Sequence, residues 1–248
     1  ALLLLVPVTS HAQAVTLSPY HAFSVDEAPT ALAFSSEGRL LLAGGQDGQI
    51  AGWNVEQKAQ ITEVHLQDEI QFLGFLSGDT SYVAVDHGGA ISVGRIGTRP
   101  TMRFQVDETP RAVALDAGRR YLAVATDEEQ IRLFDLQAGM SMGRIDARDQ
   151  LDDLLFLGFD RLGEQLIAIT RQGTVRTWNP RTQRQIRTLT LSGGQIHGSR
   201  SVIQAAATHR GAQVFVVGLQ EVALPEGGLR GQARPGDLVR RHMVIAYD

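Results

Sequence analysis

The chain has 248 residues, of which 43% are hydrophobic, and it carries a formal net charge of −4 at pH 7. This length and composition suffice for a domain with a sizeable core, whereas the acidic balance argues against a nucleic-acid-binding protein, which usually presents a basic face. The absence of cysteine excludes disulfides, thiolate metal sites and a cysteine nucleophile.

The chain begins with a short apolar run, ALLLLVPV, and the small residues of Ala12-Gln13-Ala14 follow it. These are the core and cleavage site of a secretory signal, here without a basic beginning or an initiating Met. The run is too short to span a bilayer, which needs about 20 apolar residues. We therefore expect residues 1–14 to be part of a signal peptide, with a buried first strand as the alternative. Residues 15–248 would then form an exported domain, periplasmic or secreted, of a bacterial protein.

The rest of the chain repeats one unit of about 40 residues. An apolar residue that closes a small-residue-rich strand recurs at Phe34, Phe75, Leu115, Phe159 and Ala207. In phase with it, the phrases IAGWN, ISVGR, IRLFD, VRTWN and VIAYD place their fourth residue at Trp53, Gly94, Phe134, Trp178 and Tyr247. Two landmarks in step over the same stretch predict an array of one structural unit.

Each unit contains short runs of Val, Ile, Leu and aromatic residues, separated by Gly, Asp, Asn and Ser at turn spacing. In the first unit these runs are residues 30–34, 40–44, 49–55 and 59–64. Turns such as Asp47-Gly48 suit tight hairpins because glycine accepts a positive φ. The pattern predicts an all-β propeller of four-stranded blades, with four complete repeats and a partial fifth.

Acidic residues recur where each unit begins. They are Asp26, Glu27, Asp68, Glu69, Asp107, Glu108 and Asp149. In a propeller, the loop that leads into a blade lies on the same face as the turn between the second and third strands, where Asp47, Asp86 and Asp127 lie. The sequence therefore predicts one acidic face, which would attract cations or a basic partner segment. The alternative is that these acids are merely soluble turn residues.

The fifth unit departs from the repeat. Residues 219–241 are an insertion rich in Gly, Pro and Arg, which we expect to form a loop between the second and third strands. Arg230 and Arg234 would then lie on the same face as the acids and contribute to partner binding. A surface loop without a role is the alternative.

No motif for catalysis or for cofactor binding accompanies these repeats. The seven histidines show no metal-ligand spacing, and neither a G-x-S-x-G elbow nor a phosphate-binding loop is present. We therefore expect no catalytic residue, no cofactor and no metal site.

The phrase endings resemble those of the WD40 repeat family, whose blades close on a Trp-Asp pair. The corresponding pairs are Trp53-Asn54, Phe134-Asp135, Trp178-Asn179 and Tyr247-Asp248. The family's Gly-His dipeptide is missing, and Gly94 replaces the aromatic residue in the second unit. The resemblance implies that Trp53, Phe134, Trp178 and Tyr247 are structural positions that pack between blades. Quinoprotein-like and YVTN-type propellers are related alternatives.

Two ways of closing the ring follow from this count. Residues 20–26 could complete the last blade of a five-bladed ring, or further blades or a second domain could follow Asp248. We expect the second, because the chain ends at a motif boundary.

The function that these observations predict is that of an exported, non-enzymatic scaffold that binds a protein or peptide, basic in character, through loops on one face. One alternative is a quinoprotein-like or lactonase-like enzyme with a cation at the central funnel. Another is a sensor domain of a larger multidomain protein.

Overall fold

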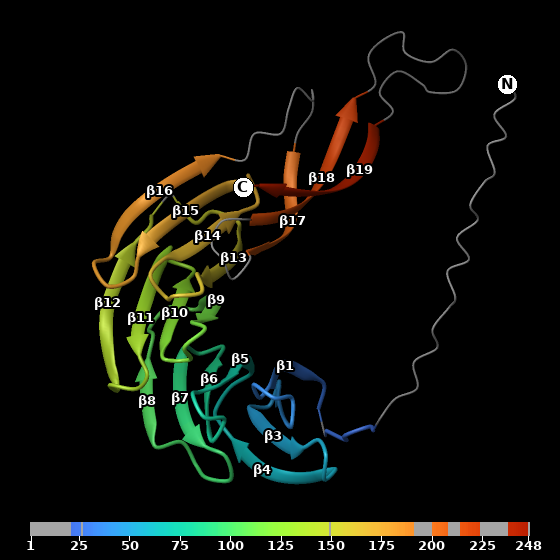
Figure 1. Cartoon of the computed structure of the whole chain (residues 1–248), viewed down its shortest axis with the longest axis vertical. Coiled ribbons are helices and arrows are strands. Elements are labelled where there is room, and N and C mark those ends of the chain that lie inside the picture. Colours follow the sequence, from blue (N-terminus) through green and yellow to red (C-terminus); the bar gives the residue numbers. More distant parts are fainter. Residues whose placement is uncertain are drawn as a thin grey trace, which may run out of the picture.

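A computed structural model describes residues 21–25, 27–148 and 150–190, and the backbone of three further strands between residues 200 and 247. In this part of the chain nineteen strands form five antiparallel sheets, which follow one another along a curve (Figure 1). The prediction of an all-β architecture built from four-stranded units is thus confirmed. No helix long and apolar enough to cross a membrane occurs among the described residues.

Each sheet is one blade. Blade 1 comprises β1 (Pro29–Phe34), β2 (Leu40–Gly45), β3 (Gln49–Asn54) and β4 (Ala59–His65). Blade 2 comprises β5 (Ile70–Phe75), β6 (Ser81–Asp86), β7 (Ala90–Arg95) and β8 (Met102–Gln105). Blade 3 comprises β9 (Pro110–Leu115), β10 (Tyr121–Thr126), β11 (Gln130–Asp135) and β12 (Met140–Asp146). Blade 4 comprises β13 (Leu154–Phe159), β14 (Leu166–Thr170), β15 (Thr174–Asn179) and β16 (Arg184–Thr190). Blade 5 comprises β17 (Arg200–Ala207), β18 (Val214–Ala223) and β19 (Leu238–Tyr247).

Within each blade the strands pair in chain order, so every blade is a simple meander. In blades 1 to 4 the first strand lies on the inner side of the curve and the fourth on the outer side (Figure 1). A β-bulge interrupts the pairing of the first and second strands in all five blades, for example between Pro29 and Ala31 and between Ile70 and Phe72. A bulge increases the local twist of the strand that carries it. Since the bulge recurs at the same place in all five described blades, the blades share backbone geometry as well as sequence pattern.

The hydrophobic core lies between the blades. One cluster joins blades 1 and 2, a second joins blades 2 and 3, and the largest joins blades 3 and 4. Phe134 packs in the second cluster and Trp178 in the third, so each aromatic side chain points toward the preceding blade. These side chains are only 4% and 2% exposed. Burial of such large groups is a principal source of stability in a protein core.

Trp53 is the corresponding residue of blade 1, where the structure describes no preceding blade. It is buried nevertheless, because Phe23 packs on it with the ring centroids 5.4 Å apart, and Val25 and Leu41 lie alongside. Residues 21–25, which would complete the last blade in a five-bladed ring, form no strand and instead cover Trp53. Tyr247 is the last residue of β19, and its side chain lies outside the described part of the chain.

In blade 2 the buried aromatic side chain lies on the second strand instead of the third. Gly94 on β7 pairs with Tyr82 on β6, whereas the matching pairs are Leu122 with Phe134 in blade 3 and Leu166 with Trp178 in blade 4. The Tyr82 ring is fully buried in the cluster between blades 1 and 2 and covers Gly94. The aromatic group has therefore moved to the neighbouring strand, which explains why the third strand tolerates glycine.

The pairing of the third and fourth strands also differs between blade 2 and blades 1, 3 and 4. In blades 1, 3 and 4 a second bulge lies immediately before the aromatic residue, between Gly52 and Trp53 in the first of them. The pairing of β7 with β8 runs from Ala90 to Val93 without a register shift. In blades 1, 3 and 4 the extra residue of this bulge lies on the fourth strand opposite the aromatic residue, as Ile61, Met142 and Ile186, whereas blade 2 has neither the aromatic residue at this position nor the shift.

The loops that join first and second strands connect neighbouring blades. Asp79 of blade 2 forms an ion pair with Arg119 of blade 3, and it accepts a 2.9 Å hydrogen bond from the backbone N–H of Ser36 in blade 1. Asp79 and Arg119 both have positive φ, of 53° and 56°. Left-handed backbone is unfavourable for residues other than glycine, so the contact that they make across the blades has to offset this cost.

The insertion corrects one prediction. Residues 219–241 were expected to be a loop, but β18 and β19 are ten residues long and pair along their whole length, up to Ala223 with Leu238. Extending the hairpin satisfies backbone N–H and C=O groups that a loop would leave to solvent. Arg230 and Arg234 lie outside the described residues.

Candidate binding face

Two sets of loops share one face of the arc. One set is the inter-blade loops, which run from the fourth strand of one blade to the first strand of the next; the other is the turns between second and third strands. We call their common surface the acidic face, and it comprises residues 46–48, 66–69, 87–89, 106–109, 127–129, 147–148, 150–153 and 171–173.

Backbone hydrogen bonds hold the two sets together in the same way in successive blades. The loop before each of blades 2 to 4 bonds to that blade's own turn, through His87 N to Glu69 O (2.8 Å), Asp127 N to Thr109 O (3.0 Å) and Arg171 N to Asp153 O (2.9 Å). The loop after each of blades 1 to 3 bonds to that blade's turn, through Leu66 N to Gly48 O (2.8 Å), Val106 N to Gly89 O (2.9 Å) and Ala147 N to Glu129 O (3.0 Å). The face is therefore a continuous, hydrogen-bonded surface.

Glycine at the end of two of these turns permits the close approach. Gly48 and Gly89 have φ of +81° and +83°. A Cβ atom on Gly48 would lie 2.8 Å from the carbonyl oxygen of Leu66, and one on Gly89 would collide with that of Val106. A side chain at either position would push the following inter-blade loop away from the turn.

The predicted acids differ in how far they are available to a partner. Asp68, Asp107 and Glu27 are exposed, Glu69 is half-buried and Glu108 is largely buried. Other acids of the face, which were not in the predicted partner-binding set, are also exposed: Asp47, Asp127, Glu128, Asp152 and Asp153. Asp26 and Asp149 lie outside the described residues. The exposed carboxylates therefore come from blades 1 to 4, and the face also carries two cations, Arg148 in the loop before blade 4 and Arg171 in the fourth blade's turn.

Arg132 is a residue that the sequence prediction missed. It is the third residue of β11 in blade 3, and its guanidinium forms an ion pair with Glu108 in the inter-blade loop. Arg176 has the same place in blade 4 and donates to the backbone carbonyl of Gln150. These contacts tie the inter-blade loops to blades 3 and 4. The only sequence signal for Arg132 and Arg176 is the arginine that stands second in the phrases IRLFD and VRTWN.

Polar atoms without a partner lie beneath this part of the face. Among the described residues, Glu108 Oε2, Arg132 Nε and Gln150 Oε1 are buried and form no hydrogen bond. Buried polar groups are nearly always satisfied, by protein, water or ligand. All three atoms are inaccessible to solvent, so a ligand on the face cannot reach them unless these side chains move.

Asp86, the last residue of β6, borders the face, and its carboxylate is buried, with the residue only 1% exposed. Burial raises its pKa and the nearby Asp68 raises it further, while the backbone N–H groups of Ala90 and Gly88 and the charge of Arg103 lower it. A raised pKa in the folded state means that Asp86 favours folding most when it is protonated. This contribution is complete below its unfolded value of about 3.9 and is lost as the pH rises through its folded pKa.

The described part of the chain contains no candidate metal site. No three His, Asp or Glu side chains there lie close enough together to hold a metal ion. What the face offers chemically is a set of fixed, exposed carboxylates, which suits recognition of a cationic group.

Comparisons with known proteins bear on the fold. No protein-family model matches the chain. Among curated proteins it is similar to the WD repeat-containing protein SL1-17 of Schistosoma mansoni, with 28% identity over 110 residues, or 44% of this chain and 36% of that protein. The match thus spans little more than a third of that relative's length. Among solved structures the chain is similar to the Cps50 (Swd1) β-propeller domain of Myceliophteria thermophila, with a TM-score of 0.63 and 15% identity over 88% of this chain and 73% of that one.

Proposed function

We propose that this chain, which has the fold of a WD40-like β-propeller, is a non-enzymatic scaffold that binds a basic protein or peptide through its acidic face. The observation that carries the proposal is the repeated pair of backbone hydrogen bonds that fixes the inter-blade loops and the turns in one surface. Exposed carboxylates on rigid loops raise the local negative potential without the entropy cost of ordering a flexible segment.

The partner's chemistry follows from the groups on this face. Asp68 and Asp107 come from inter-blade loops, and Asp152 lies in the next such loop along the arc; all three are exposed. Asp127, Glu128 and Asp153 add further exposed carboxylates, whose oxygens accept hydrogen bonds. An arginine or lysine side chain matches both features, because each carries positive charge and several N–H donors.

The test is a charge neutralisation on the face. The triple variant Asp68→Asn, Asp107→Asn and Asp152→Asn should bind a fluorescein-labelled oligo-arginine peptide at least about tenfold more weakly at low ionic strength. Its binding should also depend less on salt, because fewer charges are screened. Fluorescence anisotropy measures both quantities.

The matched control removes three negative charges elsewhere. Glu37, Glu56 and Glu164 are exposed. They lie on the face opposite the acidic face, in loops and turns that join first to second or third to fourth strands. Their change to glutamine should leave binding near the wild-type value. Equal losses in the two triple variants would show general attraction to an acidic protein, and no loss in the first would remove the acidic face as the binding site.

We also propose that the protein is exported, which rests on the apolar run and the Ala12-Gln13-Ala14 sequence. N-terminal sequencing of the protein from its natural source should then give a mature chain that begins at Val15. Recovery of a chain that retains residues 1–14 would contradict export by this route.

A further inference from the structure

A cleft of about 560 Å³ lies between the outer edges of blades 1 and 2 and reaches the acidic face at Leu66 and Gln67. One wall is the end of β4 and the residues after it, among them Glu63 and His65. The other wall is the turn between β7 and β8, with Arg99, and the start of β8, with Arg103. Pockets of 300–1,000 Å³ are of the size that holds small ligands or peptide side chains.

The walls of this cleft are fastened to each other. The backbone N–H of Gly97 in the turn donates to Thr62 Oγ1 on β4 over 3.1 Å. Within the turn, Thr98 donates from both its backbone N–H and its hydroxyl to the carbonyl of Arg95, and Thr101 N donates to Val93 O. The cleft is therefore formed before any ligand arrives, which lowers the entropy cost of binding.

The charges of the cleft are unbalanced. Both carboxylate oxygens of Glu63 already accept hydrogen bonds, from Gln49 Nε2 (3.2 Å) and Gln60 Nε2 (3.1 Å). Among the described residues no carboxylate lies within ion-pair distance of Arg99, and Arg103 makes only a long 3.4 Å bond from Nε to Ser92 Oγ. Two guanidinium groups, neither of them in an ion pair, thus face the cleft together with the one carboxylate of Glu63, so the lining is net positive in a chain whose net charge is negative.

The strand that borders the cleft has a free edge. β4 is the outermost strand of blade 1 and pairs only with β3 among the described strands. An edge of this kind can pair with an extended peptide, whose backbone supplies affinity while alternate side chains enter neighbouring pockets. Guanidinium groups bind carboxylates in a planar, two-bond geometry.

We propose that this cleft binds an extended acidic peptide segment, which adds along β4 and pairs its carboxylates with Arg99 and Arg103. The cleft meets the acidic face at Leu66 and Gln67, but its ligand has the opposite charge and contacts other side chains, so this inference does not depend on the proposed function. A propeller with both sites would hold two partners, or two segments of one partner, at the same time.

The experiment uses a fluorescein-labelled peptide of alternating glutamate and threonine, with a glutamine-for-glutamate peptide as the uncharged comparison. The wild-type chain should bind the acidic peptide and not the uncharged one. The variant Arg99→Gln with Arg103→Gln should bind it about five- to tenfold more weakly, as expected for two partly exposed ion pairs. Hydrogen–deuterium exchange should show slower exchange of residues 59–67 when the acidic peptide is bound.

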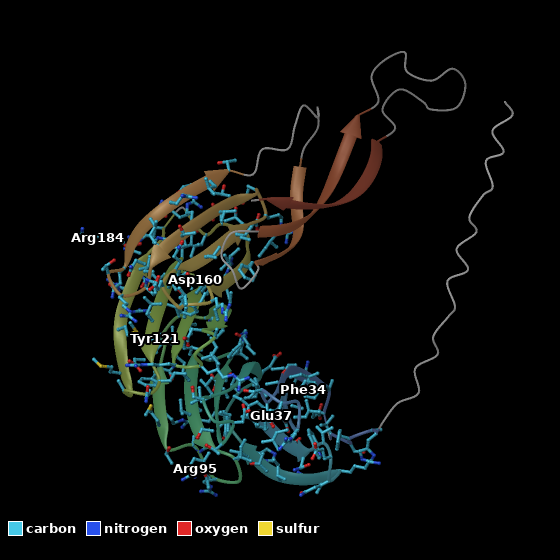
Figure 2. The ribbon with its side chains drawn as sticks, viewed as in Figure 1. Phe34, Glu37, Arg95, Tyr121, Asp160 and Arg184 are labelled. Carbon is cyan, nitrogen blue, oxygen red and sulfur yellow. The ribbon has the colours of Figure 1, made fainter. Side chains whose placement is uncertain are left out.

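The matched control is Arg181→Gln with Arg184→Gln. Both side chains are exposed on blade 4, and Figure 2 shows Arg184 on the outer side of the arc. Binding by this variant should equal that of the wild type, and the Asp68, Asp107 and Asp152 variant should also keep it. Absence of binding by the wild type, equal losses in both arginine variants, or unchanged exchange at β4 would each overturn the proposal. Circular dichroism of every variant shows whether the fold is retained.

Discussion

Replacing Trp178 by alanine should lower the free energy of unfolding by about 3–5 kcal/mol, the usual cost of removing a large aromatic side chain from a core. Trp178 is 2% exposed and packs in the cluster between blades 3 and 4, with Leu133 and Leu157 on either side of the interface. The truncated side chain would leave a cavity that two rigid sheets cannot close. Urea denaturation followed by circular dichroism measures the loss.

A control on the same blade is Ile186→Ala. Ile186 lies on β16 and is 53% exposed, so its truncation should change stability by no more than about 0.5 kcal/mol. Because repeat proteins can unfold in parts, the transition should be followed by a second probe, the fluorescence of Trp53. A Trp178→Ala protein as stable as the wild type would contradict the structural role of this position.

Restoring the aromatic residue that blade 2 lacks should destabilise the protein. A Cβ atom at Gly94 would lie 2.9 Å from the Tyr82 hydroxyl oxygen and 3.0 Å from its Cζ. A whole phenyl ring has no space there, so Gly94→Phe should cost about 1–3 kcal/mol or more through overpacking. The same urea denaturation gives the value.

The second substitution Tyr82→Leu should rescue this variant. Alone it leaves a cavity over Gly94 and lowers stability, but together with Gly94→Phe it recreates the leucine–aromatic pair of Leu122 and Phe134 in blade 3. The double variant should therefore be more stable than the sum of the two losses predicts, which a double-mutant cycle measures. Additive losses would show that Tyr82 does not substitute for the missing aromatic residue.

The strands could be predicted because their signals are local. The expected runs 30–34, 40–44, 49–55 and 59–64 agree with β1 to β4 within one residue at each end, since apolar periodicity and turn glycines both act over a few residues. The prediction that residues 219–241 form a loop also relied on a local signal, and it was wrong. The Gly, Pro and Arg content of these residues is typical of a loop, whereas the pairing of β18 with β19 depends on the opposite strand.

The site was predictable only in outline. That inter-blade loops and turns share one face follows from the propeller topology, but the pair of Arg132 with Glu108 joins residues 24 apart that only the folded sheet brings together. The cleft beside β4 and the exchange between Tyr82 and Gly94 also depend on contacts between strands or blades. Sequence spacing within one unit carries no record of such contacts.

The direction in which the aromatic side chains point has a consequence for synthesis. Phe134 and Trp178 pack on the blade that precedes their own, and Phe23 precedes Trp53, on which it packs. A chain leaves the ribosome from its N-terminus, so the surface that receives each of these side chains has been made before the side chain itself. Each new blade can dock as soon as its third strand emerges, and the propeller can grow one blade at a time without waiting for the rest of the polypeptide.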